Sequence, residues 1–324
     1  MAAPGNLKAI GFALMSMGVF ATHDVIIKLL GAYYPSLQVL FFSSLLSFPL
    51  VSLILLQEKM PGTLRPHRPG WVALRSFCAM MAGVGGFYAF SVLPLAQVYA
   101  ILFSAPLLIT LLSIPILGER VGIHRWLAVT LGLCGVLIVL RPGAGQALSL
   151  GHLAALMGAF CSATAAVITR KIGGTERPLV LLMWPMLGNL VLTGTSLGFD
   201  YVPMQLPHLA MAGMIAVLGL TGGFLSILAY RIGEAAIVAP MQYSQIIWAT
   251  IYGWFIFGEA LDLRTMIGAG VIIVSGIYIV WRERTRGSDS TRPVIASRLR
   301  TETVTAPRSS LLQRILSPRG NSHY

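Results

Sequence analysis

The amino-acid sequence predicts an all-α integral membrane protein with ten transmembrane helices, arranged as two inverted five-helix repeats. Three observations lead to this prediction: the composition, the lengths of the apolar runs, and a similarity between the two halves of the chain. Of the 324 residues, 56% are hydrophobic and 10% are charged, whereas a soluble domain has roughly 25% charged residues. A soluble fold of this size cannot bury so much apolar surface, so lipid must cover part of it.

Ten apolar runs supply the helices of this fold. A helix crosses the hydrocarbon core of a bilayer with roughly 20 residues, and most of the runs reach about that length. They cover residues 7–30, 35–56, 71–91, 95–117, 124–140, 151–171, 178–198, 208–231, 235–257 and 263–281. The first run is predicted to be a retained helix and not a signal peptide, because it matches a later run in the repeat described below.

The basic residues gather at one set of helix ends. The net charge is +12, and nine of the 23 basic residues follow Trp281. If the N-terminus is cytoplasmic, the outer side holds Lys28, Arg141 and Arg264, and most other basic residues fall inside. We therefore predict a multi-pass protein of the cell inner membrane with both termini cytoplasmic. The basic tail is expected to meet anionic lipid headgroups, and no nucleic-acid partner is expected.

The two halves of the chain resemble each other. Residues 93–119 and 233–259 are segments of equal length that both end in Gly-Glu, and the first and sixth spans align at nearly the same offset. Each half holds five spans, an odd number, so the halves must enter the membrane in opposite directions. The predicted organisation is a first repeat over 1–144, a second repeat over 145–281 and a disordered basic cytoplasmic tail over 282–324.

Several short segments carry a resemblance to a known family. They are Thr22–Leu30, Leu93–Ala96, Ser104–Leu107, Leu117–Arg120, Gly135–Gly143, Ala239–Tyr243 and Phe257–Glu259. Their order and spacing resemble the EamA-type members of the drug/metabolite transporter superfamily, over about residues 7–281. The resemblance implies ten helices in two inverted repeats, a central cavity, a small-molecule substrate and no prosthetic cofactor.

Within that family, the runs 24–28 and 239–243 look most like those of bacterial riboflavin and S-adenosylmethionine carriers. One departure concerns the second span, where many relatives place an Arg after a Phe or a Phe pair. Here two serines follow Phe42. A role for that Arg in binding an anionic group cannot be carried over, which weakens the case for a strongly anionic substrate.

The function favoured by these observations is secondary transport of a small organic metabolite across the inner membrane by alternating access. A vitamin or cofactor-like compound such as riboflavin is the first choice of substrate. An S-adenosylmethionine carrier and an exporter of amino acids or other metabolites are the alternatives. The direction of transport, the coupling ion and the oligomeric state, a homodimer included, stay open.

Two other classes of protein are an intramembrane enzyme and a membrane scaffold. The sequence has no Walker A loop and no His-Glu-x-x-His zinc motif, and its Gly-x-Ser-x-Gly match at 194–198 lies within an apolar run and not at a strand-to-helix turn. A scaffold needs no polar cavity, and the inverted repeat favours transport over both. We therefore expect no enzymatic activity, no catalytic residue, no metal site and no cofactor.

Ionisable residues inside the predicted spans are the first site candidates, because a charge at membrane depth costs roughly 2.5–3.5 kcal/mol on insertion scales. Asp24 and Lys28 are four residues apart, so they share one face of the first helix, and His23 adjoins them. Asp24 is a candidate for a solute gate or for proton coupling; an internal ion pair with Lys28 is the alternative. Arg75 is a candidate for contact with substrate or a cytoplasmic gate, with reach to lipid phosphates as the alternative.

Polar and aromatic side chains in the fourth and ninth spans are candidates for lining a cavity. Such polar groups usually face protein or water at membrane depth, and Gln side chains with aromatic rings suit a planar ring system. Hydrogen bonds between helices are the structural alternative. The candidates are Gln97, Tyr99, Ser104, Gln242, Tyr243, Gln245 and Trp248, together with Trp184 in the seventh span.

Two glutamates, Glu119 and Glu259, end equivalent spans of the two repeats. Each precedes the next predicted helix, where a carboxylate stabilises the positive end of the helix dipole. We predict a structural role at helix ends for both.

Overall fold

The computed structural model describes residues 4–56, 65–118, 123–140, 149–173, 175–176, 178–232, 238–260 and 262–285. All regular structure in these ranges is helical, as the sequence predicts. In chain order the helices are α1 (Pro4–Gly31), α2 (Ser36–Leu56), α3 (Pro69–Val92), α4 (Leu95–Leu102), α5 (Ala105–Leu117), α6 (Ile123–Leu140), α7 (Leu150–Ile172), α8 (Pro178–Asp200), α9 (Leu206–Ile232), the 3-10 helix η1 (Ala239–Ser244), α11 (Gln245–Phe257) and α12 (Leu263–Thr285).

The helix bounds follow the predicted spans closely, and most of the differences lie at the ends. α1 begins at Pro4 and α12 continues to Thr285, so both are longer than their apolar runs. The predicted boundary between the repeats falls within 141–148, and most of the predicted tail falls beyond 285; both lie outside the described residues.

The fourth predicted span is interrupted, although the sequence predicted one helix over 95–117. Phe103 and Ser104 separate α4 from α5, and the Ser104 N–H donates to the carbonyl three residues back, as in a 3-10 turn. Pro106 has no N–H to donate to the Leu102 carbonyl, and its ring crowds that carbonyl. The α-helix therefore tightens at this point and resumes in a new segment.

The ninth predicted span, the repeat counterpart of the fourth, is also irregular at its start. It opens as the 3-10 helix η1, with Pro240 in the first turn, and becomes α-helical only at Gln245. Each repeat thus contains one helix whose regular hydrogen bonding changes partway along.

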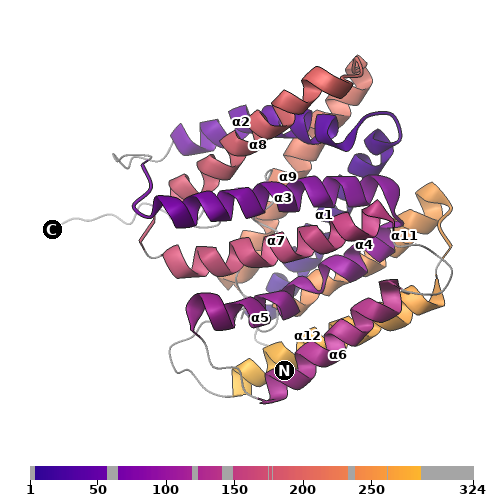
Figure 1. Ribbon diagram of the computed structural model, residues 1–324. Coiled ribbons are helices and arrows are strands. Elements are labelled where there is room, and N and C mark those ends of the chain that lie inside the picture. The colour runs from indigo at the N-terminus through magenta and orange to yellow at the C-terminus, as the bar shows by residue number, and fades with distance from the viewer. Residues whose placement is uncertain are drawn as a thin grey trace.

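The two repeats pack against each other and are not two separate bundles. α1 of the first half lies along α9 of the second, and their repeat counterparts α7 and α3 lie along each other. α2 packs on its own counterpart α8, and α6 on α12. Figure 1 shows the α2–α8 pair at one edge of the molecule, the α6–α12 pair at the opposite edge, and α3 beside α7 between them. A two-fold relation between inverted halves produces these pairings.

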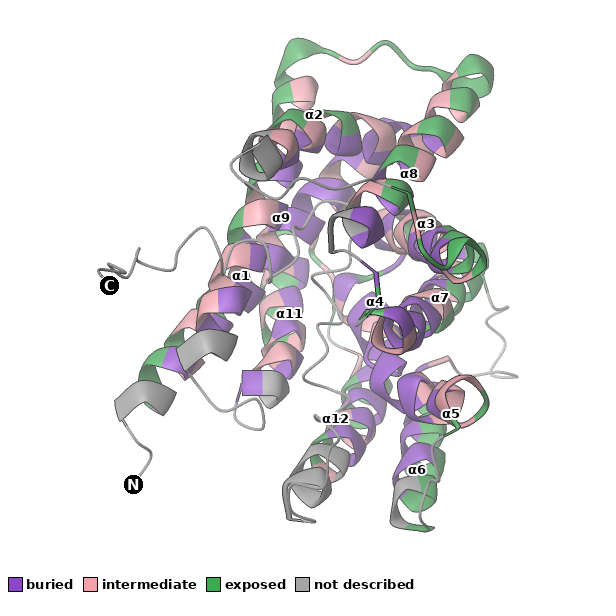
Figure 2. Ribbon diagram, turned by 90° about the vertical axis from the view of Figure 1, so that its left-hand side faces the viewer, coloured by how far each residue is buried: buried purple, intermediate pink, exposed green. Residues whose placement is uncertain are grey.

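The outer surface carries large apolar side chains, among them Leu127, Phe160 and Phe255. Figure 2 shows buried residues toward the middle of the bundle and exposed residues along α6 and α8. By length and composition, five described segments can cross a membrane: Leu7–Gly31, Pro69–Val92, Leu95–Leu117, Leu150–Ile172 and Leu206–Ala229. Shorter apolar helices cover Ser36–Ser52, Trp126–Leu140 and Leu263–Tyr278.

Small residues allow α3 and α7 to approach closely. A Cβ atom added at Gly85 would lie 2.5 Å from the carbonyl oxygen of Ala154. One added at Gly158 would lie 3.5 Å from the Ala82 carbonyl. Contact between backbones of this kind is the usual packing of small residues in membrane helices.

We predict that Gly85→Ala destabilises the protein, because the added methyl group meets backbone that cannot rotate away. The expected loss is about 1–3 kcal/mol of unfolding free energy, as for other overpacked interiors. Thermal melting of the purified protein in detergent measures it. Gly86→Ala is the matched control, because a Cβ there has no atom within 4 Å; equal losses for the two variants would contradict the prediction.

Candidate functional site

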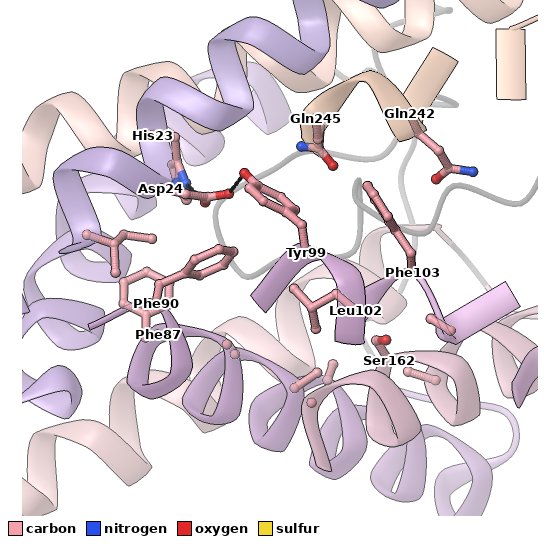
Figure 3. Close-up of a pocket in the computed structure, with 18 of the residues that line it drawn as sticks. His23, Asp24, Phe87, Phe90, Tyr99, Leu102, Phe103, Ser162, Gln242 and Gln245 are labelled. Carbon is pink, nitrogen blue, oxygen red and sulfur yellow. Dashed lines mark hydrogen bonds and ion pairs between the residues drawn. The ribbon is translucent and has the colours of Figure 1, made fainter. Parts of the chain in front are cut away.

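A cavity of about 140 Å³ lies between α1, α3, α4, α5, α7 and the η1–α11 segment, so both repeats form its walls. Figure 3 shows Gln242 and Gln245 on one side of it and Phe87, Phe90 and Ser162 on the other. Its polar lining residues are His23, Asp24, Tyr99, Ser162, Gln242, Tyr243 and Gln245. Four of the eight predicted cavity candidates, Tyr99, Gln242, Tyr243 and Gln245, therefore line one cavity together with the His23–Asp24 pair of α1.

Asp24 is the carboxylate of the cavity, and it is buried. One carboxylate oxygen lies 2.7 Å from Nδ1 of His23, and the other accepts a hydrogen bond from the Tyr99 hydroxyl. Figure 3 shows this row of three side chains, contributed by α1 and α4. Hydrogen bonds of this kind stabilise an ionised carboxylate that has lost most of its water.

Aromatic rings continue the wall from Asp24 toward the second repeat. The Tyr99 ring lies 5.4 Å from that of Phe90 and 6.0 Å from that of Phe103, measured between centroids. Phe103 in turn meets Tyr243 edge-on at 5.1 Å. These spacings are typical of stacked and edge-to-face aromatic pairs, and they give the cavity flat apolar surfaces.

Two glutamines of the second repeat add amide groups to the cavity. Gln245, at the first turn of α11, is 3% exposed, and Gln242 lies one turn earlier on η1. The side-chain nitrogen of each is buried and has no hydrogen-bond partner among the described residues. The Nε2 atom of His23 is also buried and has no hydrogen-bond partner among the described residues.

Lys28 lies outside the cavity and joins the two repeats. Its Nζ atom is 2.6 Å from a carboxylate oxygen of Glu259 and 2.5 Å from the carbonyl oxygen of Leu93. The other carboxylate oxygen of Glu259 accepts the backbone N–H of Leu95, 3.0 Å away, at the first residue of α4. Lys28 also lies over the ring of Phe257. We call the Lys28–Glu259 pair with its Leu93 and Leu95 contacts the Lys28–Glu259 latch.

The latch corrects two expectations. The ion pair found for Lys28 is with Glu259 of the other repeat and not with Asp24 on its own helix. Glu259 does serve a helix N-terminus, as predicted, but that of α4 and not that of the following helix α12. At the start of α12, the Asp262 side chain accepts the N–H of Thr265 instead. Glu119 lies outside the described residues.

Arg75 is buried away from the cavity lining. Its guanidinium donates to the Thr169 hydroxyl at 2.6 Å and to the Leu181 carbonyl at 2.5 Å. The side chain is 4% exposed, so it is used inside the protein and does not reach lipid phosphates. Arg75 thus joins α3 to α7 and α8, which gives it a structural place in the described fold.

Four further candidates do not line the cavity. Ser104 is buried at the α4–α5 break and donates to the Ile101 carbonyl. Gln97 lines a second, more polar hollow of about 240 Å³ between α4, α11 and α12. Trp248 is half-buried and stacks near Tyr252, while Trp184 is 47% exposed.

The cavity also contains residues that sequence reasoning did not single out. Phe87, Phe90 and Phe103 have the same apolar character as residues that face lipid, so composition gives no signal for them. Gly158 and Ser162 belong to a row of small residues at four-residue spacing, Ala154, Gly158, Ser162 and Ala166, a pattern typical of close helix packing. The structure shows that this row borders the cavity as well.

A helical membrane fold with a polar and aromatic cavity enclosed by two inverted repeats is typical of a membrane transporter. A model of the EamA-like transporter family matches residues 7–141 and again residues 149–282. The chain therefore belongs to the EamA-like transporter family. The expected all-α membrane fold with ten transmembrane helices in two inverted repeats is confirmed.

Curated relatives include carriers of different solutes. The chain is 27% identical to the S-adenosylmethionine uptake transporter of Rickettsia bellii, over 85% of this chain and 94% of the relative. It is 30% identical to the riboflavin transporter of Rhizobium johnstonii, over 86% and 90%. It is 23% identical to the pseudopaline exporter of Pseudomonas aeruginosa, over 82% and 94%. The chain is thus a small-metabolite transporter of the EamA type.

A solved crystal structure shares the fold. It superposes with a TM-score of 0.54 at 18% sequence identity, covering 88% of this chain and 99% of that one. At this identity the likeness concerns the fold alone.

We predict that Glu259→Gln destabilises the protein, because it leaves the largely buried Lys28 ammonium without a carboxylate. The expected loss is about 2 kcal/mol of unfolding free energy, measured by thermal melting in detergent. Adding Lys28→Gln in the same chain should recover part of the loss, since two amides can bond to each other. A Glu259→Gln variant as stable as the parent protein would contradict this prediction.

Proposed function

We propose that this protein is a secondary transporter that carries a small organic metabolite across the cell inner membrane by alternating access. The observation that carries the proposal is the cavity, because residues of both repeats line it. A site between two inverted halves can face each side of the membrane in turn when the halves rock against each other.

The distribution of basic residues supports an orientation with both termini cytoplasmic. In that orientation the Lys28 end of α1 faces outward, and the Lys28–Glu259 latch lies on the outer side of the cavity. The latch joins the end of α11 to α1 and α4, so it would have to open for a solute to pass outward. The basic tail would face the anionic headgroups of the inner leaflet.

Riboflavin is the substrate that we propose first, and S-adenosylmethionine second. Relatives named for these two solutes match most of the chain. Both compounds contain a flat ring system, which suits the rings of Phe90, Tyr99 and Phe103. Export of an amino acid or another metabolite is the alternative, and a relative named as an exporter also matches.

Asp24 is our candidate for coupling transport to a proton gradient. It is the carboxylate that lines the cavity, and it touches both a histidine and a tyrosine there. Protonation would remove the charge on which the His23 and Tyr99 contacts depend, so it would favour a different arrangement of α1 and α4.

Uptake in cells tests the proposed substrate. Radiolabelled riboflavin and S-adenosylmethionine are offered in parallel to cells that can neither make nor import them. We expect one compound to enter, with competition only by its own analogues. No uptake of either, with the protein shown to be in the membrane, would overturn both substrate assignments and favour an exporter.

We predict that Asp24→Asn lowers accumulation of the substrate against its gradient by tenfold or more, because the neutral amide cannot carry a proton. Exchange of labelled for unlabelled substrate should continue. The measurement is uptake with and without a proton gradient in vesicles that contain the purified protein. Asp200→Asn, an exposed site at the end of α8, is the matched control; full gradient-driven uptake by Asp24→Asn at equal protein levels would exclude this role.

A further inference from the structure

The side chains of residues 242–245 form an unusual polar strip. Each of these four consecutive residues has a buried side-chain atom without a hydrogen-bond partner in the described part of the chain. Gln242, Tyr243 and Gln245 also line the cavity. Most buried polar groups in proteins have a hydrogen-bond partner, so four consecutive residues with unpaired side-chain atoms require an explanation.

The repeat counterpart of this strip is apolar. At the offset of the matching segments, residues 242–245 correspond to 102–105, which read Leu-Phe-Ser-Ala. The Ser104 hydroxyl in that stretch is already bonded to a carbonyl of α4. The first repeat therefore gives the cavity a flat apolar wall at Leu102 and Phe103, and the second repeat gives an edge of amide groups.

Two other polar groups of the cavity, the Asp24 carboxylate and the Ser162 hydroxyl, already have partners, whereas the Nε2 atom of His23 has none among the described residues. Asp24 is bonded by His23 and Tyr99, and the Ser162 hydroxyl donates to the Ala159 carbonyl. The nitrogen atoms of Gln242 and Gln245 are unpaired among the described residues, and each amide also carries an oxygen that can accept a hydrogen bond. A ligand that pairs with these amides can therefore place both acceptors and donors along this edge.

The geometry points to a ligand that is a flat heteroaromatic compound with hydrogen-bonding groups along one edge, acceptors such as carbonyl oxygens or ring nitrogens together with N–H donors. Its face would lie against Phe103 and Tyr99, and its polar edge would meet the amides of Gln242 and Gln245. This inference rests on the proposed transport function and specifies the substrate class of the same cavity.

The same arrangement disfavours a ligand that is recognised mainly through a positive charge. The carboxylate of Asp24 is the anionic group of the cavity, and both of its oxygens are used by neighbouring side chains. The amide groups on the opposite side carry no charge.

Exchange of Gln245 for methionine, Gln245→Met, tests the inference. Methionine has nearly the same length and shape, but it has no donor. If the amide is kept for a ligand, its loss should leave the melting temperature of the ligand-free protein unchanged or raise it, because an unpaired buried donor is removed. Uptake of the substrate should fall about tenfold, the effect of one lost hydrogen bond of ordinary strength. Gln242→Met is measured in the same way.

Gln205→Met is the matched control, because this glutamine is exposed outside the cavity; it should change neither the melting temperature nor uptake. A clear drop in the melting temperature of ligand-free Gln245→Met would show that the amide is structural and overturn the inference, as would unchanged uptake. The measurement of melting temperature needs no substrate. If the parent protein takes up neither riboflavin nor S-adenosylmethionine, those substrate assignments fail, and the melting temperatures still decide whether the amide is structural.

Discussion

The packing of α1 against α9 and of α3 against α7 is the arrangement on which the rest of the structure depends. Each pair joins one helix from each repeat, so neither repeat encloses an interior of its own. The cavity lies where α1, α3 and α7 meet the broken helices α4–α5 and η1–α11. Since the walls belong to different halves, a relative movement of the halves changes the shape of the site. Close contact at Gly85 and Gly158 brings the backbones of α3 and α7 together, and the hydrogen bond from Arg75 to Thr169 joins the same two helices.

The two broken helices explain why polar groups can exist at this depth. A regular α-helix satisfies its own backbone, so a membrane tolerates irregular backbone only where protein or water surrounds it. Pro106 and Pro240 interrupt the regular hydrogen bonding of the equivalent helices, and both breaks border the cavity. The breaks place Tyr99 beside Asp24 and turn Gln245 inward, so the backbone irregularity and the polar site have a common origin.

The sequence predicted the fold well because lipid imposes strong constraints. Apolar runs of membrane length, basic loops and a repeated Gly-Glu end predicted the ten spans and their inverted order. The same reading identified Asp24, Tyr99, Gln242 and Gln245 as site candidates. The partners of charged residues were harder to predict. Helical spacing put Lys28 next to Asp24, whereas the structure pairs it with Glu259, more than 200 residues away. Local periodicity contains no information on contacts between repeats. Nor does it separate cavity rings such as Phe90 from rings that face lipid.

The repeats have kept a common backbone while their side chains at the cavity have diverged. A site with exact two-fold symmetry would offer the same groups from both sides and would suit a symmetric ligand. Here the first repeat contributes the hydrogen-bonded row of His23, Asp24 and Tyr99 together with a flat apolar wall, and the second contributes amides. A ligand that satisfies both sides must itself be asymmetric, with a ring face and a polar edge. Relatives with the same fold and different named solutes fit this division, because the backbone supplies the cavity and a few side chains at its two breaks decide what enters.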